Sequence, residues 1–138
     1  MKIVIDTNIL MSALIKDSIT RKIIMDSGYD FYYPEISLNE LKKHENLIFD
    51  KSGLKKSEYD NLLRNLLDNV AIIPNESFFD NLEEGAKIMK SIDPDDVVFL
   101  ALALSYNAQI WSDDKDFKRQ KKIDVLTTSE FVKKFLKG

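Results

Sequence analysis

Acidic side chains recur in this chain directly after, or at the start of, segments that have the pattern of regular structure. Asp6 follows an apolar run at positions 3–5, and Asp114 belongs to an acid-rich stretch that follows the segment 109–112. Carboxylates that lie close together repel each other and raise each other's pKa unless a cation neutralises them. The acids at such positions are Asp6, Glu40, Asp93, Asp95, Asp96, Asp113, Asp114 and Asp116.

These acids predict a divalent cation that is bound through oxygen. The chain has no cysteine and a single histidine, which excludes a thiolate site. Oxygen ligands suit a hard ion, Mg²⁺ or Mn²⁺. Mg²⁺ keeps several waters and leaves room for a phosphate oxygen. The chemistry expected of such a site is activation of a water for attack at phosphorus.

The acids need a fold that brings distant segments together, and the apolar pattern predicts one. Short apolar runs alternate with segments of helical periodicity, which indicates the α/β class, with a parallel sheet covered on both faces. Ligands bind such sheets beyond the carboxyl ends of the strands. The predicted strands are 2–5, 29–33, 70–73, 109–112 and 123–126. The predicted helices are 7–16, 18–27, 36–49, 55–68, 77–90, 94–106 (apolar on nearly all sides) and 129–136.

Several of the same acids also have an ordinary interpretation as helix caps. Ser37 and Glu40 have the spacing of a capping box, in which the glutamate only satisfies the start of a helix. Asp93 before a proline matches an N-cap, and Asp6 is also a good N-cap. Thr127 and Glu130 show the same box pattern with no expected role in chemistry. The case for a site depends on the four acidic segments together.

Composition sets the broader limits. The 138 residues predict one domain over 1–138, and the longest apolar run, at 97–104, is far too short to span a bilayer. Neither a signal peptide nor a membrane anchor is expected, which favours a cytoplasmic protein. The net charge of −3 argues against avid non-specific binding to nucleic acid. Basic residues nevertheless dominate 115–138, either as a solvated face or as a phosphate-contacting patch.

Three segments resemble the PIN-domain family of metal-dependent ribonucleases, which includes the VapC-type toxins. They are VIDTNIL at 4–10, PEISLNEL at 34–41, and DPDDVVFLALALSYNAQIWSDDKDF at 93–117, in the order of the family. The resemblance covers essentially the whole chain, and the last segment is its most specific part. It implies a three-layer α/β/α sandwich with a mostly parallel sheet, and an acidic site for Mg²⁺ or Mn²⁺.

The resemblance also implies roles for individual residues. The four family acids match Asp6, Glu40, Asp96 and Asp114, of which Asp6, Asp96 and Asp114 would hold the metal and Glu40 would orient or deprotonate the attacking water. Asn8, Ser112, Asp116 and Asp93 are expected to support the site. Asp93 and Asp95 compete with Asp96 for the third role, and Asp113 competes with Asp114 for the fourth. The candidates for contact with an RNA backbone are Lys115, Lys118, Arg119, Lys121 and Lys122.

The function expected from these residues is endoribonuclease activity on RNA, either as the toxin of a toxin–antitoxin pair or as a stand-alone RNA-processing enzyme. An antitoxin protein is a possible partner in the first case. The resemblance also suggests a homodimer, for which the apolar residues of 36–67 offer a surface.

Two alternatives remain open on sequence grounds. The first is a PIN fold that binds RNA or protein without catalysis. The second is a phosphatase of the haloacid-dehalogenase type, which also begins with a strand that ends in an aspartate. Those enzymes place a second aspartate two residues later, where this chain has Asn8. An amide cannot do the general acid work of a carboxyl group, which disfavours the phosphatase.

Overall fold

The structure is a computed structural model that describes residues 1–15 and 19–136. At its centre lies a five-stranded sheet with the strand order β3-β2-β1-β4-β5, in which every neighbouring pair is parallel. The strands are β1 (Lys2–Ile5), β2 (Asp30–Pro34), β3 (Val70–Ile73), β4 (Gln109–Trp111) and β5 (Val125–Leu126).

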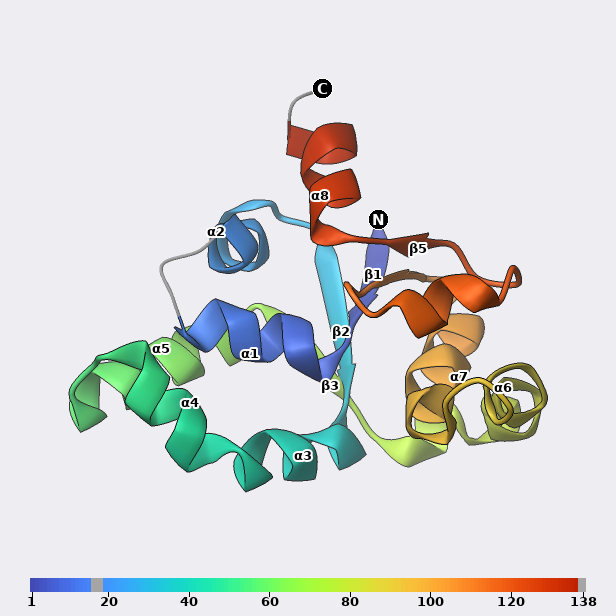
Figure 1. The fold of residues 1–138 in the computed structure, drawn as a ribbon, viewed down its shortest axis with the longest axis horizontal. Helices are drawn as coiled ribbons and strands as arrows, with labels where there is room; N and C mark the ends of the chain where they lie inside the picture. Colours follow the sequence, from blue (N-terminus) through green and yellow to red (C-terminus); the bar gives the residue numbers. More distant parts are fainter. Residues whose placement is uncertain (16–18, 137–138) are drawn as a thin grey trace.

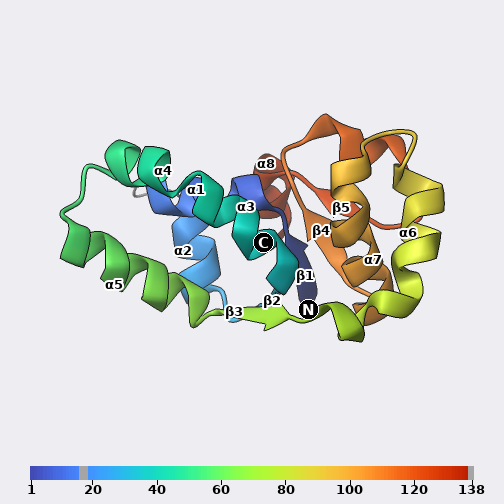
Figure 2. The ribbon, with the colours of Figure 1, turned by 90° about the horizontal axis from the view of Figure 1, so that it is seen from below.

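Helices cover both faces of this sheet. In Figure 1, α1, α2, α4 and α5 lie to the left of β1 and β2, α3 lies below these strands, and α6 and α7 lie to their right; Figure 2 shows the same arrangement from below. The predicted α/β class and three-layer α/β/α sandwich are therefore confirmed, with an all-parallel sheet. The helices are α1 (Thr7–Ile15), α2 (Ile19–Asp26), α3 (Leu38–Lys43), α4 (Glu45–Ser52), α5 (Lys56–Leu67), α6 (Leu82–Met89), α7 (Val97–Tyr106) and α8 (Thr128–Phe131).

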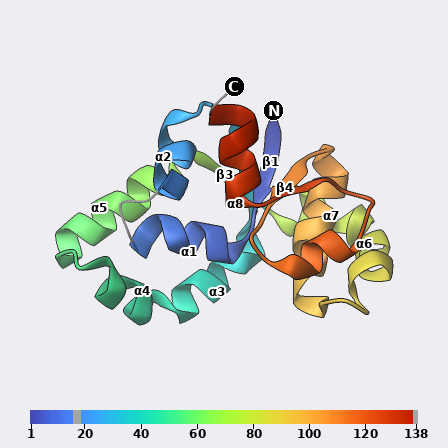
Figure 3. The same ribbon diagram turned by 45° about the horizontal axis from the view of Figure 1, so that its top comes forward.

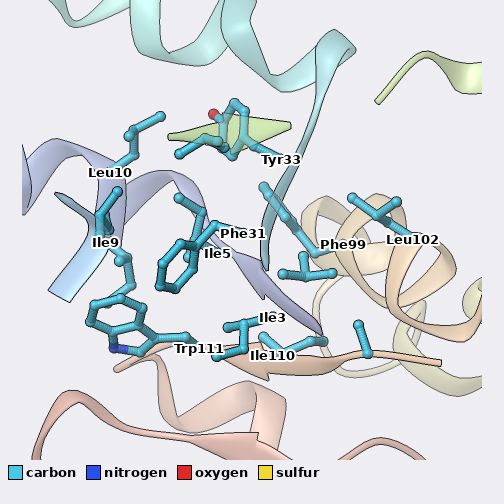
Figure 4. Packing of buried hydrophobic residues seen from close by; sticks show 14 of the residues in the cluster. Ile3, Ile5, Ile9, Leu10, Phe31, Tyr33, Phe99, Leu102, Ile110 and Trp111 are labelled. Carbon is cyan, nitrogen blue, oxygen red and sulfur yellow. The ribbon is translucent and has the colours of Figure 1, made fainter. Parts of the chain in front are cut away.

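The central strands are apolar because neither face meets solvent. Ile3, Val4 and Ile5 of β1 are all fully buried, although successive side chains point to opposite faces. Figure 4 shows the cluster around β1, to which Phe31 and Trp111 contribute from the two neighbouring strands. Alternation of polar and apolar residues is absent from such strands, which explains why an uninterrupted apolar run predicted β1 correctly.

Helix α7 is the most deeply buried helix of the described chain. Residues 100–103 are all 0% exposed, as the continuous apolar pattern predicted. Gly85 of α6 permits close packing against α7, because a Cβ at this position would lie 3.1 Å from the carbonyl oxygen of Val97. This contact fixes the first turn of α7, which directly follows Asp96.

The last helix packs against the sheet through aromatic rings. Phe131 of α8 stacks on Trp111 of β4 with ring centroids 4.8 Å apart, and it meets Tyr29 edge-on at 5.9 Å. Figure 3 shows α8 rising beside β1. The capping box of Thr127 and Glu130 is present as predicted, and the helix continues as a π-helix over Val132–Leu136.

Some predicted boundaries are wrong. The single helix expected over 36–49 is a 3₁₀ turn (Glu35–Ser37) followed by α3 and α4, which are separated at His44, where φ is −102° and ψ is 10°. The helix expected over 77–90 begins only at Leu82, after two 3₁₀ turns. Strand β5 starts at Val125 rather than at residue 123. The predicted helix ends at Lys16 and Ser18 lie outside the described residues.

Candidate active site

The acidic segments meet at the carboxyl ends of β1, β2 and β4. Strands β1 and β4 are neighbours in the sheet, with Ile5 opposite Trp111, although the chain passes through β2 and β3 between them. The strand order therefore reverses between β1 and β4, and crevices at such positions are where open α/β sheets bind ligands. Asp6 follows β1 directly, and Ser112 follows β4.

A small acidic cavity opens at this reversal point. Its volume is about 50 Å³, more than the roughly 10–15 Å³ that a cavity needs to hold one water. Four of the predicted site acids line it, together with the supporting residue Asn8. The lining residues are Asp6, Thr7, Asn8, Glu40, Asp95, Asp96, Phe99 and Asp114.

Asp6 has both a structural role and a place in the cavity. Its Oδ1 accepts a hydrogen bond of 2.9 Å from the amide of Ile9, which caps the start of α1. Its Oδ2 accepts a hydrogen bond from the hydroxyl of Ser112. Burial raises the pKa of Asp6 from 3.8 to about 6, although these two hydrogen bonds lower it. The helix-cap interpretation and the site interpretation are compatible.

A close group of carboxylates comprises Asp93, Asp96 and Asp114. One carboxylate oxygen of each lies within 4.8 Å of the others. Asp96 is only 9% exposed, and its Oδ2 has no hydrogen-bond partner within the described ranges 1–15 and 19–136. Burial, and then the charges of Asp93 and Asp114, raise the pKa of Asp96 to about 8. An unpartnered oxygen among repelling carboxylates is the arrangement that a divalent cation would relieve, so these residues fit the predicted Mg²⁺ or Mn²⁺.

The two candidates for the fourth acid have different surroundings. The carboxylate of Asp113 accepts hydrogen bonds from the amide and the hydroxyl of Thr128, at 2.7 and 2.8 Å, and so helps anchor α8. Asp114 lines the cavity instead. Of the two, Asp114 is the residue in a position to contact a ligand there.

Ser112 and Asp116 hold the turn that carries Asp114. The hydroxyl of Ser112 accepts a hydrogen bond of 3.0 Å from the Asp114 amide while donating to Asp6. The Asp114 Oδ1 accepts from the amide of Asp116 at 2.9 Å. The carboxylate of Asp116 lies 3.8 Å from the Arg119 guanidinium and does not line the acidic cavity among the residues that the structure describes.

The three acids at the start of α7 also differ in their surroundings. Asp93 accepts a hydrogen bond of 3.0 Å from the amide of Asp95 through Oδ1, as the predicted N-cap, and also belongs to the close carboxylate group. Asp95 lines the cavity but is exposed. Asp96 is the buried member.

Glu40 is not the helix cap that its spacing with Ser37 predicted. The Ser37 side chain makes no capping hydrogen bond, so the capping box is absent, whereas the box at Thr127 is complete. Glu40 instead reaches the cavity, where its Oε2 lies 3.4 Å from the hydroxyl of Thr7.

A comparison with protein-family models decides the family. The model described as PIN domain matches residues 4–131, which is most of the chain. This chain belongs to the PIN-domain family. The resemblance noted in the sequence is therefore confirmed. A comparison with curated proteins gives no significant match.

The PIN fold is also evident in solved structures. A chain of the crystal structure of VapBC2 from Rickettsia felis, bound to a DNA fragment from their promoter, superposes with a TM-score of 0.63. The sequence identity is 20%, and the match covers 92% of this PIN domain and 98% of that chain. At this low sequence identity, the similarity is evidence about the fold alone. No helix in the described part of the PIN domain has the length and apolar character needed to cross a membrane.

Within residues 1–15 and 19–136, none of the basic residues lines the acidic cavity. Lys118 forms an ion pair with Glu130, and Arg119 lies near Asp116. Lys118 and Lys121 line a separate pocket with Gln120. The structure thus does not bring the five candidate RNA-contacting residues into the acid cluster; they lie on the segment that leaves Asp114, and all are exposed: Lys115, Lys118, Arg119, Lys121 and Lys122.

Two residues with hydroxyl groups next to the site were missed in the sequence. Thr7 lies between Asp6 and Asn8, so its position was a signal that could have been used. Tyr33 was assigned only to an aromatic strand, yet its hydroxyl lies 2.8 Å from the Thr7 hydroxyl, between residues 26 apart in the chain. No local pattern reveals that contact.

Proposed function

We propose that this PIN domain is a Mg²⁺- or Mn²⁺-dependent endoribonuclease that hydrolyses phosphodiester bonds in RNA, acting as a single domain over residues 1–138. The observation that carries the proposal is the close group of Asp93, Asp96 and Asp114, two of whose members, Asp96 and Asp114, line one cavity with Asp6 and Glu40. Membership of the PIN-domain family disfavours the phosphatase alternative.

The residues have separate tasks in this proposal. Asp96 and Asp114 would hold the metal with Asp6, directly or through water, and Asp93 lies close enough to assist. A bound Mg²⁺ or Mn²⁺ lowers the pKa of a coordinated water and stabilises charge on a phosphate. Glu40 is the general base, because its carboxylate reaches the cavity and is not used as a helix cap.

The toxin of a toxin–antitoxin pair is the biological role we favour over stand-alone RNA processing. Its support is the similarity in fold to a chain of the VapBC2 complex. The partners would then be an antitoxin protein and RNA, in the cytoplasm. A second copy is a further candidate partner, since Leu41, Leu63 and Leu67 line an apolar pocket between α3 and α5.

Cleavage of labelled RNA by the purified full chain tests the activity. Transfer RNA, ribosomal RNA and messenger RNA are incubated with Mg²⁺ or with Mn²⁺, and product ends are mapped. We expect cleavage that EDTA abolishes and that Asp6→Asn, Asp96→Asn and Glu40→Gln each reduce, Glu40→Gln by at least about 100-fold, the usual scale for loss of a general base.

A matched control distinguishes the loss of a carboxylate at the site from the loss of any surface carboxylate. Asp68→Asn removes an exposed carboxylate just after α5, so it should leave cleavage unchanged. Cleavage that survives both EDTA and Asp6→Asn would contradict the metal mechanism. RNA binding without cleavage in either metal would favour the non-catalytic alternative.

A further inference from the structure

Two buried hydroxyl groups connect the start of α1 with the turn that precedes α3. The Tyr33 ring is 0% exposed, and its hydroxyl donates a hydrogen bond of 2.8 Å to the carbonyl oxygen of Ser37. The same hydroxyl lies 2.8 Å from Oγ1 of Thr7, which is 4% exposed. Oγ1 of Thr7 in turn lies 3.4 Å from Oε2 of Glu40. The chain of contacts therefore runs from Ser37 through two hydroxyls to the glutamate.

The Ser37 carbonyl is a significant anchor point because of where it lies. Ser37 ends a 3₁₀ turn and immediately precedes α3, whose third residue is Glu40. The Ser37 side chain does not cap this helix. Tyr33 therefore supplies, from β2, a restraint on the helix start that the expected capping box does not provide.

The two hydroxyl protons permit two arrangements. Either Tyr33 donates to Ser37 and accepts from Thr7, or Tyr33 donates to Thr7 and Thr7 donates to Glu40. The second arrangement gives the Glu40 carboxylate a hydrogen bond, and it is the only one that the described residues offer it. In the first arrangement Tyr33 holds the helix start through the Ser37 carbonyl. In the second it directs the Thr7 hydroxyl to the carboxylate, so each arrangement restrains Glu40 by a different route.

We propose that Thr7 and Tyr33 are positioning residues that hold Glu40 toward the acidic cavity. This inference rests on the proposed function for its effect on catalysis, but the restraint on the Glu40 side chain does not depend on that function. Glu40 is an exposed glutamate with several rotatable bonds, so without a restraint its carboxylate would sample many orientations. Small misplacements of a catalytic group cost large factors in rate.

The chain offers substitutions that remove the hydroxyls and little else. Tyr33→Phe keeps the ring, which packs against Phe99 with centroids 6.0 Å apart. Thr7→Val keeps the shape of the side chain, and Thr7→Ser retains the hydroxyl. Tyr59→Phe is the matched control, because Tyr59 is a buried tyrosine of α5 that does not line the acidic cavity.

The first measurement is single-turnover RNA cleavage. We expect Thr7→Val and Tyr33→Phe each to slow cleavage by about 10-fold with little change in RNA affinity. Thr7→Ser should restore most of the rate, and Tyr59→Phe should have no effect. In a Glu40→Gln background the same two substitutions should cause no further loss, because the residue that they position has already lost its function. Losses that multiply with that of Glu40→Gln would overturn the proposal.

The second measurement needs no activity. In protein labelled with ¹³C at glutamate carboxyl groups, the Glu40 resonance should shift and its side-chain mobility should increase in Thr7→Val and Tyr33→Phe, but not in Tyr59→Phe. A Glu40 signal unchanged in all three variants would overturn the positioning role even if RNA is cleaved. If the wild-type chain cleaves no RNA, the proposed function fails, while this signal still decides the positioning of Glu40.

Discussion

The hydroxyl of Ser112 donates a hydrogen bond to Oδ2 of Asp6, which joins the end of β4 to the end of β1 across 106 residues of sequence. Ser112 is 0% exposed, and its oxygen also accepts from the Asp114 amide. One small side chain therefore satisfies one acid of the site and fixes the turn that carries another.

Ser112→Ala is expected to destabilise the fold by about 1–3 kcal/mol, because it leaves a buried carboxylate oxygen and a backbone amide without partners. It should also raise the pKa of Asp6 above about 6, since the Ser112 hydrogen bond lowers that pKa. Urea denaturation and carboxyl NMR measure the two effects. Ser129→Ala, at an exposed position of α8, is the control. Equal stability of the two variants would contradict the role of Ser112.

The stability of the metal-free protein should decrease as the pH rises. The pKa of Asp96 is about 8 in the folded protein against an ordinary value of 3.8. The folded state therefore binds this proton more tightly than the unfolded chain between these two values, and the free energy of unfolding falls by up to about 1.4 kcal/mol per pH unit there. Asp6, with a pKa of about 6, adds to the fall at lower pH.

Thermal denaturation in EDTA from about pH 5 to about pH 8 measures this dependence. Asp96→Asn carries no titrating group at this position, so its Tm should vary much less over the range and should exceed that of the wild type near pH 8. Parallel Tm curves for the two proteins would show that Asp96 titrates normally.

Mg²⁺ or Mn²⁺ should raise the Tm of the wild-type protein. A ligand that binds only the folded state stabilises it by about 2.7 kcal/mol at a concentration 100 times its Kd. We expect Asp96→Asn or Asp114→Asn to reduce the shift strongly, because each removes a member of the close carboxylate group. Asp68→Asn should retain it. The shift should be larger near pH 8 than near pH 6, where Asp96 is mostly protonated.

The salt dependence of RNA binding should identify the basic residues that contact phosphates. Lys118 and Arg119 have acidic partners in Glu130 and Asp116, so their replacement by alanine should change the dependence little. Lys121→Ala and Lys122→Ala should each reduce the slope of log affinity against log salt by about 0.7, the value for one contact with a single strand. If the slope stays at the wild-type value in both variants, the basic residues of this segment form a solvated face and do not contact RNA phosphates.

Local patterns predicted the strands well and the helix boundaries less well. The run 70–73 corresponds to β3 without change, although β3 is an edge strand in which only Val70 and Ile73 are buried. The break at His44 was missed because the apolar positions of α3 and α4 continue one periodic pattern. Only packing decides where such a pattern bends.

The same limits of local sequence patterns apply to the prediction of the site. Asp6, Asp96 and Asp114 were predicted as site residues, and they line one cavity, because each lies at the end of a predictable element. The capping prediction failed for Ser37 and Glu40 but held for Thr127 and Glu130, although both pairs have the same spacing. In the first pair, the Ser37 carbonyl is held by Tyr33, which lies on a strand and reaches it only in the folded protein.

The pairing of β1 with β4 has a consequence for the synthesis of the chain. Residues 3–5 leave the ribosome about 100 residues before their partners at 109–111. Contacts between such distant segments form late and slowly in folding. The nascent chain therefore has no acidic cavity until the segment that carries Asp114 has been synthesised.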